Sequence, residues 1–303
     1  MLKWSSRLGC MAVVCCVLVL QGCKGSSYNP VIKLTPGDTY ALIETTHSSG
    51  KVSSPTGTLD DKGMVELHYE LKVLDGDSTT GYTIEGKISS GKTEESIGIG
   101  GAATIPFQNA DGRTPDQEML DAVRGKTFRF SLSPKGEAGP ITHAEAFHQA
   151  LKEVDLTRFP GLNRLPAQAR KQLLDTWRSG FSDGALQSTF KGTFQILPDK
   201  PVRPGDSWTI PSYPDPQTGA TVNQTLTLNH VEGKHLILNS SETLEPDASL
   251  SSPLSFSGKA TGTITLDTAT GLCTGQQMKM DLNETAPASG TYTIDVKVEL
   301  FHM

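Results

Sequence analysis

A serine with the spacing of a catalytic nucleophile lies within Gly180-Phe-Ser-Asp-Gly184. The G-x-S-x-G pattern serves nucleophilic catalysis when a strand precedes the serine and a helix follows it, because the sharp turn exposes the hydroxyl. Here a helical pattern precedes the motif, so we expect Gly180 to end one helix and Ser182 to cap the next. This context does not fit a hydrolase, and the chain shows no coherent set of catalytic residues. We predict a protein that is not an enzyme and has no cofactor or metal site.

The first 22 residues have the pattern of a signal segment that is removed after export. Two basic residues precede an uncharged run, Leu8–Leu20, which is too short for the roughly 20-residue helix that spans a membrane. The run ends in Leu20-Gln-Gly-Cys23, which resembles the lipobox of bacterial lipoproteins, whose cysteine thiol becomes a thioether to diacylglycerol. The alternative is an ordinary secretory signal followed by a chance cysteine. We predict a lipoprotein signal peptide over residues 1–22 and lipidation at Cys23.

The expected lipid anchor determines where the rest of the chain is located. Each buried methylene of an acyl chain contributes about 0.8 kcal/mol, so several chains hold a protein on a membrane. Residues 23–35 are predicted as a tether between the lipid and the fold. Lys24 follows the cysteine, where an aspartate would favour inner-membrane retention in enteric-type bacteria. We therefore predict a bacterial cell-envelope protein that is anchored in the outer membrane and faces the periplasm.

Composition and charge argue against several classes of function. The chain has 27 Lys+Arg against 33 Asp+Glu, a net charge of -6, so it lacks the basic excess expected for nucleic-acid binding. Its 30 glycines and 18 prolines favour many turns and therefore short strands.

Of its five cysteines, three lie in the expected signal peptide and one is the expected lipid site. Cys273 then has no disulfide partner, and we predict a buried thiol; the alternative is a nucleophile.

Alternation of apolar and polar residues with a period of two predicts antiparallel strands in several segments. The clearest are Val65–Val73, Tyr82–Ile88, Phe128–Leu132, Met278–Leu282 and Tyr292–Leu300. In each segment one face is apolar and the other is polar, as expected for a sheet that is covered on one side.

A helical pattern interrupts the strands over residues 143–190. Its apolar positions include Phe147 and Leu151 in a first helix, and Leu173 and Trp177 in a second. If these four side chains face the inner side of the sheet, they line a pocket for a hydrophobic ligand. Side chains in a solid core have the same spacing, so both interpretations stay open here.

Thr35-Pro-Gly-Asp-Thr-Tyr40 and Arg203-Pro-Gly-Asp-Ser-Trp208 are similar and lie 168 residues apart. Each precedes a stretch with a hairpin pattern, which fits an internal duplication. The alternative is that Pro-Gly-Asp is simply a common turn. With a duplication, the chain has an N-terminal β module over residues 36–142 and a C-terminal β module over residues 191–303, joined by the helical segment.

The most distinctive motif is Pro198-Asp-Lys-Pro-Val-Arg-Pro-Gly-Asp-Ser-Trp208. It resembles the P-x-K-x-V-x-x-G-D-x-W signature of a family of bacterial lipoproteins of unknown function, which also combine a lipobox, β-rich sequence and a central helical stretch. A second shared motif is Asp267-Thr-Ala-Thr-Gly271, in a strand–turn–strand hairpin. The resemblance implies no activity and supplies no catalytic residues. We interpret the motif residues structurally: Gly205 for a turn, Asp206 for a side-chain to backbone bond and Trp208 for packing.

These patterns predict an α+β protein, mainly antiparallel β, with a curved sheet or half-barrel and a small central helical layer. We predict a lipid-anchored cell-envelope protein that acts as a non-catalytic binding module for a hydrophobic ligand. This function is an analogy with lipid carriers of the bacterial envelope, in which an acyl chain lies between sheet and helices. The alternative is a structural or assembly lipoprotein that docks an envelope protein partner, with the terminal strand over residues 291–301 as a free edge.

Overall fold

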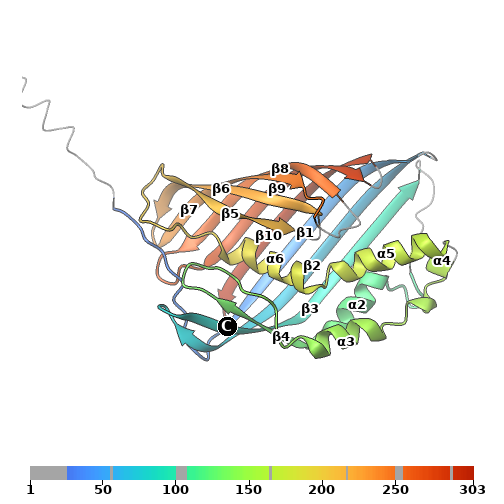
Figure 1. Ribbon diagram of the computed structural model, residues 1–303, viewed down its shortest axis with the longest axis horizontal. Coiled ribbons are helices and arrows are strands. Elements are labelled where there is room, and N and C mark those ends of the chain that lie inside the picture. Colours follow the sequence, from blue (N-terminus) through green and yellow to red (C-terminus); the bar gives the residue numbers. More distant parts are fainter. Residues whose placement is uncertain are drawn as a thin grey trace, which may run out of the picture.

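The computed structural model describes seven stretches of the chain, whose elements are drawn in Figure 1. They are residues 26–54, 57–99, 108–163, 166–215, 218–249, 255–286 and 289–303. The expected signal peptide and Cys23 lie outside these residues, so cleavage and lipidation remain predictions.

Ten antiparallel strands form one open, curved sheet in the order β4-β3-β2-β1-β10-β9-β8-β7-β6-β5. The strands are β1 (Thr39–Ser54), β2 (Gly57–Asp77), β3 (Gly81–Ile99), β4 (Thr127–Leu132), β5 (Ser207–Asp215), β6 (Ala220–Glu232), β7 (His235–Pro246), β8 (Ser255–Asp267), β9 (Cys273–Ala286) and β10 (Ser289–His302). Strand β1 pairs with β10 along its length, so residues 36–142 and 191–303, which we predicted as two modules, contribute to one sheet. The predicted architecture, mainly antiparallel β with few helices, is confirmed.

Two expectations about the strands are wrong. The composition favoured short strands, but β2 has 21 residues and β3 has 19. The two strands pair with each other over most of their length, which satisfies backbone groups even at glycine and serine positions. The terminal strand, predicted as a free edge, is β10 in the middle of the sheet, where it pairs with both β1 and β9. The edges of the sheet are β4 and β5.

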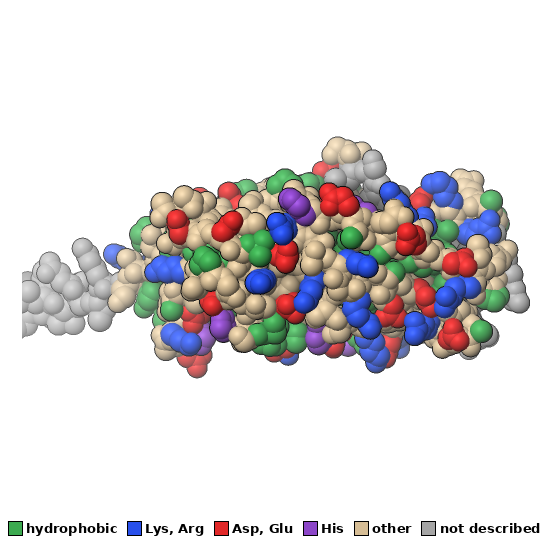
Figure 2. All heavy atoms as spheres, turned by 90° about the horizontal axis from the view of Figure 1, so that it is seen from below, with side chains coloured by type: hydrophobic (Ala, Val, Ile, Leu, Met, Phe, Trp, Pro, Cys, Tyr) green, Lys and Arg blue, Asp and Glu red, His purple; other side chains and the backbone are tan. Residues whose placement is uncertain are grey.

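The two faces of the sheet differ in polarity. Directly paired residues of antiparallel strands point to the same face, and one such row contains Tyr69, Leu42 and Leu300, which are 2%, 0% and 4% exposed. On the opposite face charged side chains pair across strands, as Lys87 does with Glu70 at 2.8 Å. Figure 2 shows one outer face of the molecule, on which basic and acidic side chains are interspersed. Burial therefore fixes the register, since a slip of one residue would turn the apolar rows to water.

A helical layer lies on the concave side of the sheet (Figure 1). Its elements are α2 (Pro115–Val123), α3 (Glu145–Glu153), η2 (Leu156–Arg158), α4 (Pro160–Asn163), α5 (Ala167–Ser179) and α6 (Asp183–Phe194). The helices after β4 fall in the segment predicted to be helical, and the last of them continues to Phe194. In the part of the chain that the structure describes, no helix is long and apolar enough to cross a membrane.

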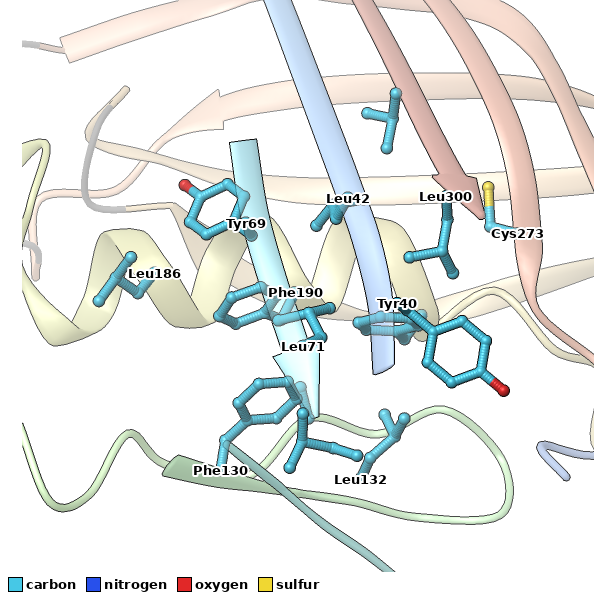
Figure 3. Packing of buried hydrophobic residues seen from close by; sticks show 14 of the residues in the cluster. Tyr40, Leu42, Tyr69, Leu71, Phe130, Leu132, Leu186, Phe190, Cys273 and Leu300 are labelled. Carbon is cyan, nitrogen blue, oxygen red and sulfur yellow. The ribbon is translucent and has the colours of Figure 1, made fainter. Parts of the chain in front are cut away.

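Phe190 holds α6 on the sheet through aromatic contacts with two strands (Figure 3). Its ring stacks on Phe130 of β4 with the centroids 4.5 Å apart, and lies 5.7 Å from the ring of Phe128. On the other side it lies 5.6 Å from the ring of Tyr69 in β2. Aromatic pairs of this kind contribute about 0.5–1.5 kcal/mol beyond the area that they bury. The fully buried Phe190 therefore joins α6 to both β2 and β4.

The chain before β1 is packed on the fold over much of the predicted tether. Tyr28 and Val202 exchange two backbone hydrogen bonds of 2.8 Å, and the Ile32 amide donates to the Pro134 oxygen at 2.8 Å. Ile32 has no exposed surface. From Tyr28 onward the predicted tether is thus part of the fold, and Val202 of the distinctive motif helps to hold it.

The two Pro-Gly-Asp turns have equivalent hydrogen bonds. In each, the Asp amide donates to the carbonyl three residues earlier, and the glycine has a positive φ, 97° at Gly37 and 92° at Gly205. These features define a type II turn, with proline second and glycine third. Each glycine amide also donates to the following hairpin, Gly37 to Val73 at 2.8 Å and Gly205 to Leu228 at 2.7 Å. The turns are similar in structure, while duplication of whole modules stays a prediction.

Truncation of Phe190 should loosen α6. We expect the free energy of unfolding of Phe190→Ala to fall by about 3–5 kcal/mol, because a buried ring is lost and a cavity is left. Phe301→Ala is the matched control, since Phe301 is 49% exposed and its loss should change stability by no more than about 0.5 kcal/mol. Urea unfolding measures both values, and equal losses for the two variants would contradict this packing.

Candidate ligand cavity

A cavity of about 270 Å³ lies between the concave face of the sheet and the first turns of α6. Strands β1, β2 and β3 form one wall, and α6 with the residues just before it forms the other. The lining residues are Glu44, Thr46, Val65, Leu67, Tyr69, Thr93, Asp116, Gly180, Phe181, Ala185, Leu186 and Thr189. Val65 is 38% exposed and marks a side that solvent reaches. Apolar groups and hydroxyls thus make up most of the lining, together with two carboxyl groups.

Alternation along β1 brings Glu44 to the cavity. Tyr40 and Leu42 point to the concave face and are buried, and Glu44 follows them in the same phase. Its direct partner in β2 is Leu67, which also lines the cavity. Glu44 is therefore an acidic residue on the face of β1 that carries apolar side chains at the preceding positions.

Helix α6 begins at the serine of the G-x-S-x-G motif. The Ser182 hydroxyl accepts a hydrogen bond from the Ala185 amide at 3.2 Å and donates one to the Ser179 oxygen at 2.7 Å. The predicted helix cap is thus confirmed, and the hydroxyl is occupied by that role. The helix then brings Ala185, Leu186 and Thr189 to the cavity.

The carboxyl group of Glu44 is buried and only partly satisfied. The residue as a whole is half-buried, but its Oε2 is shielded from solvent and has no hydrogen-bond partner among the described residues. Burial raises the pKa of Glu44 to about 7, the charge of Asp215 adds to this rise, and a hydrogen bond from Thr189 opposes it. Buried acceptors in proteins are nearly always paired, so this oxygen is available to a ligand.

Groups from both sides of the curved sheet meet near Glu44. Tyr69 lies on β2, and burial, followed by the charge of Glu44, raises the pKa of its hydroxyl well above the usual value. Asp215 is the last residue of the edge strand β5 and accepts a hydrogen bond of 3.3 Å from Ser188 of α6. Ser188 binds Asp215 of β5, and the adjacent Thr189 binds Glu44 of β1. Helix α6 therefore connects these two strands across the concave face.

A second buried carboxyl group, Glu242 of β7, offers a comparison. It is 8% exposed, and burial raises its pKa to about 7, although hydrogen bonds from its neighbours lower it. Gln224 Nε2 donates to Glu242 Oε1 at 2.8 Å and lies 3.0 Å from Ser240 Oγ. Glu242 is not among the residues that line the cavity. Like Glu44 it has a buried carboxyl group, but this group already has partners within the protein.

The four residues predicted to face a ligand are placed differently. Phe147 has no exposed surface and packs edge-to-face on Phe128 with the ring centroids 6.0 Å apart. Leu151 is 7% exposed and belongs to the same hydrophobic cluster. The side chains of Leu173 and Trp177 lie outside the described part of the chain. As ligand contacts the four remain predictions, and the lining of the cavity consists of other residues.

Cys273 is buried, as predicted, and burial raises the pKa of its thiol to about 12. Because the thiolate is the nucleophilic and metal-binding form, this thiol acts as a packing group. Within the described stretches, no group of three or more His, Cys, Asp or Glu side chains could hold a metal ion.

Three hollows of about 650, 530 and 450 Å³ are larger than the cavity but are lined by other groups. The second follows residues of the Pro198–Trp208 motif. There the Asp206 side chain accepts from the Arg203 amide at 2.8 Å, and Trp208 packs on the core and donates to the Ile196 oxygen at 3.2 Å. The predicted structural roles of these residues are confirmed. Among the described residues, none of the three hollows is lined by a buried polar atom without a partner, which makes the Glu44 cavity the stronger candidate.

Comparison with protein families gives one assignment. The model of a family described as "Family of unknown function (DUF6263)" matches residues 68–273, more than half of the chain. The chain belongs to this family. The matched residues of this DUF6263 protein include α6 and most of the cavity lining, whereas Glu44 precedes them. No curated protein matches the sequence.

Solved structures that resemble the DUF6263 protein are distant from it. A lipovitellin structure on lipid–protein interactions has a TM-score of 0.49 and 10% identity, over 88% of this chain and 25% of the lipovitellin chain. An outer membrane channel from Pseudomonas putida F1 has a TM-score of 0.21 and 7% identity, over 89% and 97% of the two chains. The translocator domain of the autotransporter NalP from Neisseria meningitidis has a TM-score of 0.22 and 7% identity, over 95% and 93%. The chain spans about a quarter of the lipovitellin chain, and none of these similarities carries a functional assignment.

Ionisation of Glu44 should make stability fall as pH rises. Its pKa of about 7 in the folded protein lies above the ordinary value of 4.5, so the folded state holds the proton more tightly than the unfolded state. Ionisation between these two values then destabilises the fold. Glu44→Gln lacks this titration, and we expect it to gain on the order of 3 kcal/mol over wild type between pH 4.5 and pH 8.

Urea unfolding of Glu44→Gln and wild type at low and high pH measures this gain. Glu245→Gln is the control, because Glu245 is an exposed residue of β7 and its replacement leaves Glu44 in place. This variant should keep the loss of stability that ionisation of Glu44 causes. A gain for Glu44→Gln that is the same at both pH values would contradict a buried titration at this position.

Proposed function

We propose that this DUF6263 protein is a lipid-anchored, non-catalytic binding module of the bacterial cell envelope, on the periplasmic side of the outer membrane. Its ligand is a small hydrophobic molecule, held in the cavity between β1–β3 and α6. The observation that carries the proposal is the cavity itself, which combines apolar walls with a shielded carboxyl oxygen that lacks a partner. Small-molecule sites commonly have this composition, in which a few polar groups orient an apolar ligand.

The hydroxyl and thiol groups considered as nucleophiles support binding rather than catalysis. Ser182 caps α6, and its hydroxyl donates to the Ser179 oxygen. Burial keeps the Cys273 thiol protonated at neutral pH. Thr189 and Tyr69 lie beside Glu44, but burial raises the pKa of the tyrosine further, which makes it a weaker nucleophile.

The volume of the cavity limits the size of the ligand. A water molecule occupies about 30 Å³ of liquid, so 270 Å³ corresponds to roughly nine water-sized atoms. A short amphiphile fits entirely, and a longer chain can place one end in the cavity and pass Val65 into solvent. An acyl chain buried at full length between sheet and helices, as in the analogy with lipid carriers, needs more space.

The proposed lipid anchor keeps this cavity close to a membrane. Cys23 is five residues before Tyr28, where the fold begins, so the lipid and the fold are at most about 18 Å apart. Apolar molecules partition into membranes, and a binding module held at the surface has access to them.

The sheet edges give little support to the docking of a partner strand. The edge of β4 is covered by the segment 138–142, which forms two bridges to it. Strand β5 contains Pro211 and Pro214, which have no backbone N–H to donate. Both features obstruct edge pairing, so the structural or assembly alternative has no supporting observation at these edges.

Filling the cavity should abolish ligand binding without unfolding the protein. Ala185 has no exposed surface and lines the cavity, so the phenyl ring introduced by Ala185→Phe should fill the cavity. We expect wild-type protein, as the mature chain with Cys23→Ser, to bind 1-octanol, which has nine non-hydrogen atoms, in isothermal titration calorimetry. Ala185→Phe should lose this binding at least tenfold, while its thermal midpoint stays near that of wild type.

Ala260→Phe is the matched control. Ala260 is 1% exposed on β8, three strands from β1, so overpacking there should cost about 1–3 kcal/mol of stability and leave octanol binding intact. Octanol binding by a folded Ala185→Phe variant would place the ligand elsewhere, and no binding by wild type would overturn the proposed function.

Lipidation is tested through the two cysteines that remain after signal cleavage. In a bacterial host, Cys23→Ser should move the protein from the membrane fraction to the soluble fraction, because the acyl chains cannot attach. Cys273→Ser is the control and should stay with the membrane, since Cys273 is buried inside the fold. Retention of Cys23→Ser in the membrane fraction, or an N-terminal peptide without diacylglycerol in wild type, would contradict the anchor.

A further inference from the structure

We infer that the Glu44 cavity selects cationic ligands: its occupant is an apolar molecule that carries an ammonium group, which pairs with Glu44 Oε2. This inference rests on the proposed binding function and adds the chemical class of the ligand. It predicts discrimination among amphiphiles of equal length that differ only in the charge of the polar end.

The charge around the cavity is negative. Its lining contains the carboxyl groups of Glu44 and Asp116, and none of the described lining residues is Lys, Arg or His. Asp215 adds negative charge close enough to affect the ionisation of Glu44. Charges interact strongly in an environment that excludes water, so this field favours a cation and opposes a carboxylate or phosphate. Fatty acids and anionic headgroups are therefore disfavoured at this position.

The hydrogen-bonding groups of the cavity also fit an ammonium group. Thr189 satisfies part of the Glu44 carboxyl group, while Oε2 has no partner among the described residues. An ammonium has three donors and no acceptor, so it can bind Oε2 and still donate to hydroxyl oxygens such as that of Thr46 in the lining. Hydrogen bonds between charged groups are roughly twice as strong as neutral ones. An alcohol supplies one donor, and a carboxylate supplies none.

The apolar part of such a ligand has a matching surface. Phe181, Leu186 and Leu67 line the cavity on both walls, and the first two are 8% and 2% exposed. A chain of eight carbons with a terminal nitrogen has nine non-hydrogen atoms, which agrees with the roughly nine that the volume accommodates. Octylamine, 1-octanol and octanoate are therefore suitable probes, because they share a chain and differ at the polar end.

The test measures the binding of these three probes at pH 8 by isothermal titration calorimetry. We expect wild-type protein, as the mature chain with Cys23→Ser, to bind octylamine at least tenfold more tightly than 1-octanol, and octanoate most weakly. Glu44→Gln should remove the preference for octylamine over 1-octanol. Asp116→Asn, which leaves Glu44 in place, should reduce the preference by a smaller factor.

Glu242→Gln is the matched control and should leave all three affinities unchanged, because its carboxyl group is also buried but lies outside the cavity lining. Equal affinity of wild type for octylamine and octanol would overturn the charge selection and leave the proposed function standing. A preference that survives in Glu44→Gln would also overturn it. If none of the probes binds wild type, the proposed function fails first.

Discussion

The structure depends on how α6 covers the concave face of an open sheet. A sheet with two edges, β4 and β5, has an apolar concave face that its strands do not bury by themselves. Phe190 covers the part over β2 and β4 by stacking on Phe130, and Ser188 binds Asp215 at the end of β5. Helix α6 therefore connects both sides of the sheet. The Ser182 cap fixes the residue at which α6 begins, and the cavity over β1 lies beside the first turns of this helix.

The remaining space explains why the acidic side chain of Glu44 lies on a mainly apolar face. An ionised carboxylate without partners opposes folding, because burial removes it from water. Glu242 avoids much of this cost through Gln224, whereas Glu44 has an oxygen without a partner among the described residues. Groups that cost stability in this way concentrate where binding needs them. The contrast between two carboxyl groups on one face supports a functional reason for Glu44.

Local patterns in the sequence predicted the features that depend on neighbouring residues. Alternation found the clearest strands, helical spacing found α3 and α5, and turn chemistry found the bend at Gly205. The strand order was not predictable in this way, since pairing of β1 with β10 joins the two ends of the chain and depends on tertiary packing. The terminal strand was mistaken for an edge for this reason. Glu44 was missed because β1 was not recognised, and only its phase with Tyr40 and Leu42 shows that it points inward.

The most direct test of a ligand site at Glu44 is a crystal structure with a bromine-labelled amine, since bromine is located by its anomalous signal. The mature chain with Cys23→Ser would be crystallised with 6-bromohexylamine, which is small enough for a cavity of about 270 Å³. We expect one bromine peak between Phe181 and Leu186, with the nitrogen in hydrogen-bond contact with Glu44 Oε2. A cavity that holds only water, with the bromine absent or in the hollow beside Trp208, would contradict the site.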